Sequence, residues 1–247
     1  MIASPVIGHR GAAQLAPENT LAGIRMAAES GVSWVELDVT LLGDGTPVLC
    51  HDEVLDRCSN RQGPLAFLSV SDLPELDMGS WFAPQWLNEP MPHLSDALLL
   101  CQELNLGLNL EIKPFGLDPE QVARRVFAET EVYWQQPERL LVSSFDETLL
   151  TLYRALTADT QMAMLFDFLP ELWQLKAEAL NAVSIHCDCS LISREEVQQI
   201  KTAGYDLYCY TCNNPIQAAE LLQWGVDGIF TDNPLLMKDL LPSPCNA

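Results

Sequence analysis

Residues 33–39 read Ser33-Trp34-Val35-Glu36-Leu37-Asp38-Val39. The apolar residues of this run predict a β-strand, and similar short runs alternate with longer segments of helical spacing along the chain. This alternation is typical of an α/β fold whose strands run parallel. With this run, the sequence contains eight candidates for parallel strands: residues 5–9, 33–39, 106–112, 139–144, 161–166, 182–186, 206–210 and 226–231.

Helical spacing fills most of the intervals between these strands. A helix is also expected to start at about Ser95, and an apolar piece at 235–241 can close the chain as a last helix. Eight strands and their helices in 247 residues predict a (β/α)8 TIM barrel, with residues 1–247 forming one domain. The other predicted helices cover residues 20–30, 120–134, 147–156, 169–180, 195–203 and 215–224.

Two segments depart from the simple alternation. Residues 47–51 follow the second strand too closely for a parallel crossover, so we expect an antiparallel hairpin through Asp44-Gly45. That turn places His51 opposite residues 36–38. Residues 52–92 are rich in Pro, Gly, Ser and Asn and show no strong periodicity, which predicts a small inserted subdomain over the mouth of the barrel.

Charge and composition exclude several classes of partner. The formal net charge is −21, and the only adjacent basic pair is Arg124-Arg125, so nucleic acid and anionic membrane surfaces would be repelled. No apolar run approaches the roughly 18 residues that span a bilayer. The N-terminus lacks the pattern of a secretory signal, and the eight cysteines are expected to be reduced thiols, so we expect a cytoplasmic location. The oligomeric state stays open, with a homodimer as one option.

Ionisable residues gather where the predicted strands end. In a TIM barrel the active groups stand at the carboxyl ends of the strands. Alternate residues of a strand share a face, so Glu36 points with Asp38, and Glu111 points with Lys113. Such charges are costly on an inward face unless they are paired or bound to a metal. We expect seven side chains to converge there: His9, Arg10, Glu36, Asp38, His51, Glu111 and Lys113.

The three carboxylates predict a site for a hard divalent cation. Oxygen ligands suit Mg²⁺ or Ca²⁺ better than zinc, with Mn²⁺ as a further option. The alternative is a buried network of salt bridges, pairing Glu36 with Arg10 and Glu111 with Lys113.

Six ordered motifs carry a family resemblance. They are Ile7-Gly8-His9-Arg10-Gly11, Pro17-Glu18-Asn19-Thr20, Glu36-Leu37-Asp38-Val39, His51-Asp52, Glu111-Ile112-Lys113 and Phe230-Thr231-Asp232-Asn233-Pro234. Together they resemble the glycerophosphodiester phosphodiesterase family, whose compact cytosolic members in enteric bacteria are similar to this chain in form.

The resemblance implies a substrate and roles for the residues. The substrates would be deacylated phospholipids, such as glycerophosphocholine and glycerophosphoethanolamine, hydrolysed to sn-glycerol 3-phosphate and an alcohol. Glu36, Asp38 and Glu111 would be the metal ligands, His9 and His51 the acid–base pair, and Arg10 and Lys113 the phosphate-binding groups. One imidazole would be neutral and the other protonated, which predicts a bell-shaped pH profile.

Some alternatives stay open at this point. The nucleophile is either the 2-hydroxyl of glycerol or water, and the sequence does not assign the base to one histidine. Another phospholipase-C-like phosphodiesterase acting on a lipid, or a non-catalytic protein that binds phosphodiesters, would share the same residues.

Further residues at strand ends are candidates for the pocket or for metal binding. Phe145, His186 and Tyr210 are candidate pocket walls, although for His186 a hydrogen-bonded histidine of the barrel rim is the favoured interpretation. Cys187, Cys189, Cys209 and Cys212 suggest either a fortuitous zinc site or small buried apolar side chains. The Cys-x-Cys spacing favours the second interpretation.

Overall fold

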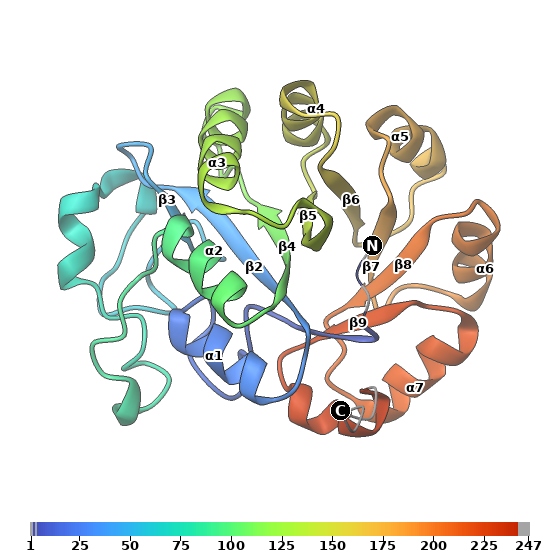
Figure 1. Cartoon of the computed structure of the whole chain (residues 1–247), viewed down its shortest axis with the longest axis horizontal. Coiled ribbons are helices and arrows are strands. Elements are labelled where there is room, and N and C mark those ends of the chain that lie inside the picture. The colour runs from blue at the N-terminus through green and yellow to red at the C-terminus, as the bar shows by residue number, and fades with distance from the viewer. Residues whose placement is uncertain (1, 3, 242–247) are drawn as a thin grey trace.

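The strands form a closed barrel. The computed structural model describes residues 2 and 4–241. Its nine-stranded sheet has the order β1-β9-β8-β7-β6-β5-β4-β2-β3, and an additional β1–β2 pairing closes the ring. The helices surround this ring (Figure 1). Every pairing is parallel except that of β3 with β2. The predicted (β/α)8 TIM barrel is therefore confirmed.

The elements follow the predicted segments closely. The parallel strands are β1 (Val6–Gly8), β2 (Trp34–Leu41), β4 (Gly107–Ile112), β5 (Leu140–Ser144), β6 (Gln161–Phe166), β7 (Ser184–Asp188), β8 (Asp206–Tyr210) and β9 (Gly228–Thr231). The α-helices are α1 (Leu21–Glu29), α2 (Leu94–Glu103), α3 (Pro119–Tyr133), α4 (Glu147–Leu156), α5 (Trp173–Leu180), α6 (Arg194–Thr202) and α7 (Pro215–Trp224).

Burial on both faces explains why the strands read as apolar runs. Their outward residues pack under the helices in the main apolar core. Inside the barrel, Ile7, Leu141, Tyr208 and Phe230 form a second buried cluster. Side-chain caps fix where several helices begin, because each cap accepts a backbone N–H that would otherwise lack a partner. These caps are Thr20, Asp118, Asp146, Ser193 and Asn214.

The hairpin after β2 has the expected register. In β3 (Pro47–Leu49), Leu49 lies opposite Val39 and Pro47 lies opposite Leu41. Beyond the strand, the Cys50 N–H donates to the carbonyl of Asp38 at 3.1 Å. His51 follows directly, so the hairpin delivers its side chain to the carboxyl end of β2, as its sequence position predicts.

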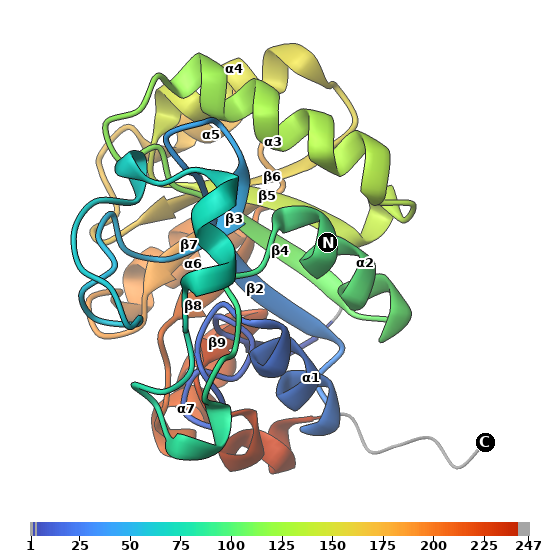
Figure 2. The ribbon, with the colours of Figure 1, turned by 90° about the vertical axis from the view of Figure 1, so that its left-hand side faces the viewer.

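Residues 52–92 contain three short 3-10 helices, η1 (Leu65–Phe67), η2 (Val70–Glu75) and η3 (Pro84–Trp86). Figure 2 faces this segment, drawn in cyan to green, beside β3. Its apolar side chains form a cluster separate from the main core, with Leu55, Leu65, Leu73 and Met78 among its members. One domain with an inserted subdomain over 52–92 remains our prediction for the organisation of the chain.

Two predicted helices were wrong in detail. The segment at 235–241 is a 3-10 helix, η5 (Pro234–Leu240), interrupted by non-helical backbone at Met237, and it ends in extended backbone at Leu241, the residue before Pro242. Another short 3-10 helix, η4 (Pro137–Arg139), precedes β5. The helix predicted at 169–180 begins only at Trp173, and Pro170 disfavours the helical conformation at Leu169. No helix in the described part of the chain is long and apolar enough to cross a membrane.

Candidate active site

A cavity of about 230 Å³ opens at the carboxyl ends of the strands. Of the ten predicted site residues, all but Asp38 line it, and Asp38 lies directly beneath with 1% of its surface exposed. The lining consists of His9, Arg10, Glu36, His51, Asn109, Glu111, Lys113, Phe145, Leu165, Asp167, His186, Tyr210, Thr211 and Phe230. The structure therefore brings together residues from the first strand to the last.

Three carboxylates meet at the base of this cavity. Glu36, Asp38 and Glu111 are buried, and one oxygen from each lies within 4.8 Å of the others. Burial, with the negative charges of Asp38 and Glu111 nearby, raises the pKa of Glu36 well above its usual value. Glu36 Oε1 is buried and has no hydrogen-bond partner in the described part of the chain. A divalent cation fits this set of hard oxygen donors and would satisfy that oxygen.

Two cations partly compensate the acidic cluster. Lys113 Nζ lies 2.5 Å from Glu111 Oε1 and 3.3 Å from Asp38 Oδ1, and Arg10 Nε lies 3.4 Å from Asp38 Oδ2. Burial alone would raise the pKa of Asp38, but the charges of Lys113 and Arg10 outweigh burial and lower it. Part of the alternative salt-bridge network is thus present, yet the contact between Arg10 and Glu36 uses the Arg10 backbone N–H, at 2.9 Å from Oε2.

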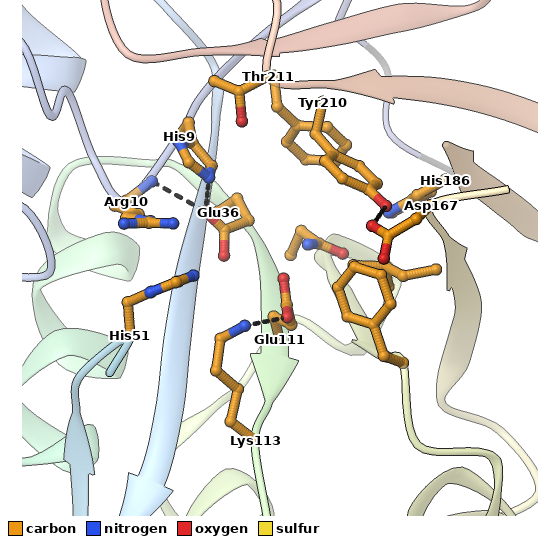
Figure 3. Close-up of a pocket in the computed structure, with 14 residues that line it drawn as sticks. His9, Arg10, Glu36, His51, Glu111, Lys113, Asp167, His186, Tyr210 and Thr211 are labelled. Carbon is orange, nitrogen blue, oxygen red and sulfur yellow. Dashed lines mark hydrogen bonds and ion pairs between the residues drawn. The ribbon is translucent and has the colours of Figure 1, made fainter. Parts of the chain in front are cut away.

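His9 is held by an aspartate that follows the last strand. Its Nδ1 lies 2.6 Å from Asp232 Oδ1, and Asn213 donates to Asp232 Oδ2 at 2.6 Å. Burial alone would raise the pKa of Asp232, but its hydrogen bond to His9 lowers it, so the carboxylate is ionised and Nδ1 carries the proton. The other ring nitrogen, Nε2, lies 3.8 Å from Glu36 Oε2. Of the two His9 ring nitrogens, Nε2 is therefore the one that faces the carboxylate cluster (Figure 3).

The turn that carries His9 depends on a glycine. Arg10 and Gly11 both have positive φ, at 49° and 86°. A Cβ at Gly11 would lie 2.6 Å from the backbone carbon of Gly23 in α1. Only glycine fits this close approach, which sets the chain direction directly after His9 and Arg10.

His51, which follows β3, is also held by an aspartate. Its Nδ1 lies 2.7 Å from Asp52 Oδ1, which leaves Nε2 to face the cavity. Two imidazoles, each oriented by an aspartate, thus stand on the same side of the carboxylate cluster as Arg10 (Figure 3). Two such imidazoles are suited to general acid–base catalysis, in which one accepts a proton and the other donates one.

The opposite wall is aromatic. The rings of Phe145 and Tyr210 meet edge to face with centroids 5.9 Å apart, and the Tyr210 hydroxyl donates to Asp167 Oδ1 at 3.2 Å. His186 lies below, 1% exposed and packed against Tyr208 and Phe230. Burial lowers the pKa of His186 to about 3, so its imidazole is neutral at pH 7. His186 is thus a buried residue of the cavity floor, and the rim placement is wrong.

The four cysteines behave as buried apolar side chains. Cys187 and Cys209 lie opposite each other on β7 and β8, and all four thiols are buried and free. Within residues 2 and 4–241, Glu36, Asp38 and Glu111 are the only group of three or more side chains with metal-ligand spacing. The fortuitous zinc site is therefore not supported.

Sequence reasoning assigned no role to several residues of the site. Asp232 and Asp167 directly follow β9 and β6, so the strand-end rule that found Glu36 could have found them. Asn213 and Arg57 gave no such signal. Asn213 lies beyond the end of β8, and Arg57 lies within the aperiodic segment 52–92.

The barrel has a carboxylate cluster and two aspartate-held histidines at the carboxyl ends of its strands. These features fit the class of metal-assisted hydrolases. The model of the glycerophosphoryl diester phosphodiesterase family matches residues 9–236. A glycerophosphodiester phosphodiesterase of Caldanaerobacter subterraneus is 31% identical over 238 residues, covering 96% of this chain and 97% of the relative. The chain belongs to the glycerophosphodiester phosphodiesterase family, as its motifs predict.

Solved structures agree with this assignment. A phosphodiesterase of Oleispira antarctica, in complex with the product sn-glycerol-3-phosphate, superposes with a TM-score of 0.92 and 34% identity, covering 95% of each chain. A glycerophosphodiester phosphodiesterase of Agrobacterium tumefaciens has a TM-score of 0.79 and 26% identity, covering 96% of this chain and 99% of the other. The likeness extends over nearly the whole barrel.

Proposed function

We propose that this chain hydrolyses glycerophosphodiesters, such as glycerophosphocholine and glycerophosphoethanolamine, to sn-glycerol 3-phosphate and an alcohol. The family assignment and the product complex of the Oleispira antarctica structure support this reaction. The observation that carries the proposal is the cluster of Glu36, Asp38 and Glu111 beside two aspartate-held imidazoles.

The three carboxylates are the proposed ligands of one divalent cation, Mg²⁺ or Ca²⁺, with Mn²⁺ as a further option. When bound, the cation supplies fixed positive charge for the phosphoryl oxygens, whose negative charge grows in the transition state. Glu36 Oε1 has no hydrogen-bond partner among the described residues, so binding the cation would give this buried oxygen a partner.

His9 and His51 are the proposed acid–base pair. In each ring Nδ1 is engaged by an aspartate, so Nε2 exchanges protons with the substrate. One imidazole accepts a proton from the nucleophile, and the other donates a proton to the departing alkoxide. The nucleophile is either the 2-hydroxyl of glycerol, giving a cyclic phosphate that water then opens, or water itself.

Fixed positive charge and an apolar wall would orient the substrate. Arg10 and Lys113 line the cavity beside the carboxylates, where they can bind the phosphate and stabilise its charge. Phe145 and Tyr210 provide aromatic surface on the opposite side, with His186 at the floor. We propose these three as the walls for the organic part of the substrate.

The setting of the enzyme is also part of the proposal. The charge of −21 disfavours nucleic acid and anionic membrane surfaces as partners, and the proposed substrates are small molecules. We propose a cytoplasmic location, with a homodimer as one option for the oligomeric state.

Product analysis tests the reaction. Purified protein should convert glycerophosphocholine into sn-glycerol 3-phosphate and choline, because the bond to the head-group alcohol is the one that breaks. Phosphorus NMR distinguishes this product from phosphocholine. Release of phosphocholine would show that the bond to glycerol breaks, against the proposed reaction. Turnover of intact phospholipid alone would replace the proposed substrate with that of a lipid phosphodiesterase. Binding without turnover would point to a non-catalytic protein.

A further inference from the structure

A continuous series of ion pairs leads from His51 away from the cavity. Asp52, which holds the His51 ring, is itself held by Arg57, with Nε 2.7 Å from Oδ2 and Nη2 3.1 Å from Oδ1. The same guanidinium continues to Glu18, with Nη1 2.6 Å from Oε2 and Nη2 2.8 Å from Oε1. Arg57 thus clamps two carboxylates with both edges of one planar group.

Glu18 joins this series to a second arginine. Its Oε1 also accepts from Arg10 Nη1 at 2.8 Å, and Arg10 Nε lies 3.4 Å from Asp38. Burial alone would raise the pKa of Glu18, but the hydrogen bonds and charges of Arg57 and Arg10 lower it, so it is a buried anion. One carboxylate therefore fixes two arginines that reach different parts of the site.

Arg57 differs from the other residues of this ion-pair series in its place in the sequence and in its exposure. It belongs to the inserted segment 52–92, lies outside the lining of the cavity, and has 45% of its side chain exposed. Its side-chain hydrogen bonds are all made with two carboxylates, those of Asp52 and Glu18. What it reaches is the aspartate that orients His51.

We propose that Arg57 is a positioning residue that, anchored by Glu18, sets the orientation and tautomer of His51 through Asp52. This inference rests on the proposed function, in which His51 exchanges a proton with the substrate.

The physical reason is that Asp52 needs an external restraint. It is one residue from His51, and a quarter of its side chain is exposed, so without Arg57 it would turn toward water. The His51 ring would then lose the acceptor for its Nδ1 proton and distribute that proton between both nitrogens. The guanidinium of Arg57 donates to both carboxylate oxygens of Asp52, whereas the single ammonium of a lysine would hold only one of them.

Kinetics provide the first test. Arg57→Ala should lower kcat by about 10- to 100-fold, the usual cost of losing an orienting partner, while KM stays within about twofold. Arg57→Lys should retain an intermediate kcat. Arg61→Ala is the matched control, since Arg61 lies in the same segment and pairs with Asp72 and Glu75 at the surface. Its activity should equal that of the wild type.

A double-mutant cycle separates positioning from a general effect on the fold. If Arg57 acts through His51, adding Arg57→Ala to His51→Ala should cost no further activity. Losses that multiply would overturn the proposal, as would an unchanged kcat for Arg57→Ala.

Nitrogen NMR of the histidine rings tests the same inference without turnover. In the wild type the His51 signal, assigned by its absence from His51→Ala, should show the Nδ1–H tautomer, and Arg57→Ala should shift it toward Nε2–H. An unchanged tautomer in Arg57→Ala would overturn the proposal. Absence of wild-type turnover would overturn only the proposed function, because the ring spectra still decide the role of Arg57.

Discussion

Replacing either His9 or His51 by alanine is expected to lower kcat by about 10²–10⁴-fold, the range that one positioned proton transfer contributes. In each ring Nδ1 is fixed by an aspartate, which leaves Nε2 for proton transfer, and alanine removes that nitrogen. Steady-state rates with glycerophosphocholine measure the loss. Thermal unfolding is measured beside the rates, because each substitution also removes the ion-pair partner of Asp232 or Asp52.

His93→Ala is the control for these variants. His93 precedes α2 and lies outside the lining of the cavity, so the same substitution there should leave kcat unchanged. Near-normal activity of His9→Ala or His51→Ala would remove that histidine from the mechanism. Equal losses in all three variants would show that the assay reports folding and not proton transfer.

Glu36→Gln is expected to have opposite effects on stability with and without the cation. In the presence of EDTA, the variant should unfold at a higher temperature than the wild type. Glu36 is buried beside two other carboxylates and has one oxygen without a partner, a cost of about 1–3 kcal/mol that the amide relieves.

With the cation at about one hundred times its dissociation constant, the wild type should gain about 2.7 kcal/mol, and the variant much less. Thermal unfolding with EDTA and with added Mg²⁺ or Ca²⁺ measures both effects. Glu120→Gln is the control, since Glu120 is an exposed helix residue paired with Arg124 and should respond to the cation as the wild type does. A Glu36→Gln protein stabilised by the cation as strongly as the wild type would contradict the ligand assignment.

Local sequence rules predicted the barrel and most of its cavity because these depend on periodicity. Strand residues at alternate positions share a face, and carboxyl ends meet at one side of a barrel, so Glu36, Asp38 and Glu111 could be placed together without coordinates. The close spacing of the hairpin to β2 likewise predicted that His51 would join them.

Contacts across long sequence separations could not be predicted in this way. Asp232 holds His9 from 223 residues away, and Arg57 reaches Glu18 across 39 residues from a segment without periodicity. The burial of a side chain could not be predicted from the sequence either. The predicted strand ended at His186, which is compatible with a rim residue, but β7 continues to Asp188, and His186 is buried against Tyr208 and Phe230.

We infer that phosphodiester hydrolysis depends on a divalent cation bound by the carboxylate cluster. The most direct measurement is release of sn-glycerol 3-phosphate from glycerophosphocholine before EDTA, after EDTA, and after Mg²⁺, Ca²⁺ or Mn²⁺ is restored singly. We expect activity to be lost with EDTA and recovered with at least one ion. Full activity in EDTA, or no release with any ion from folded protein, would contradict this account.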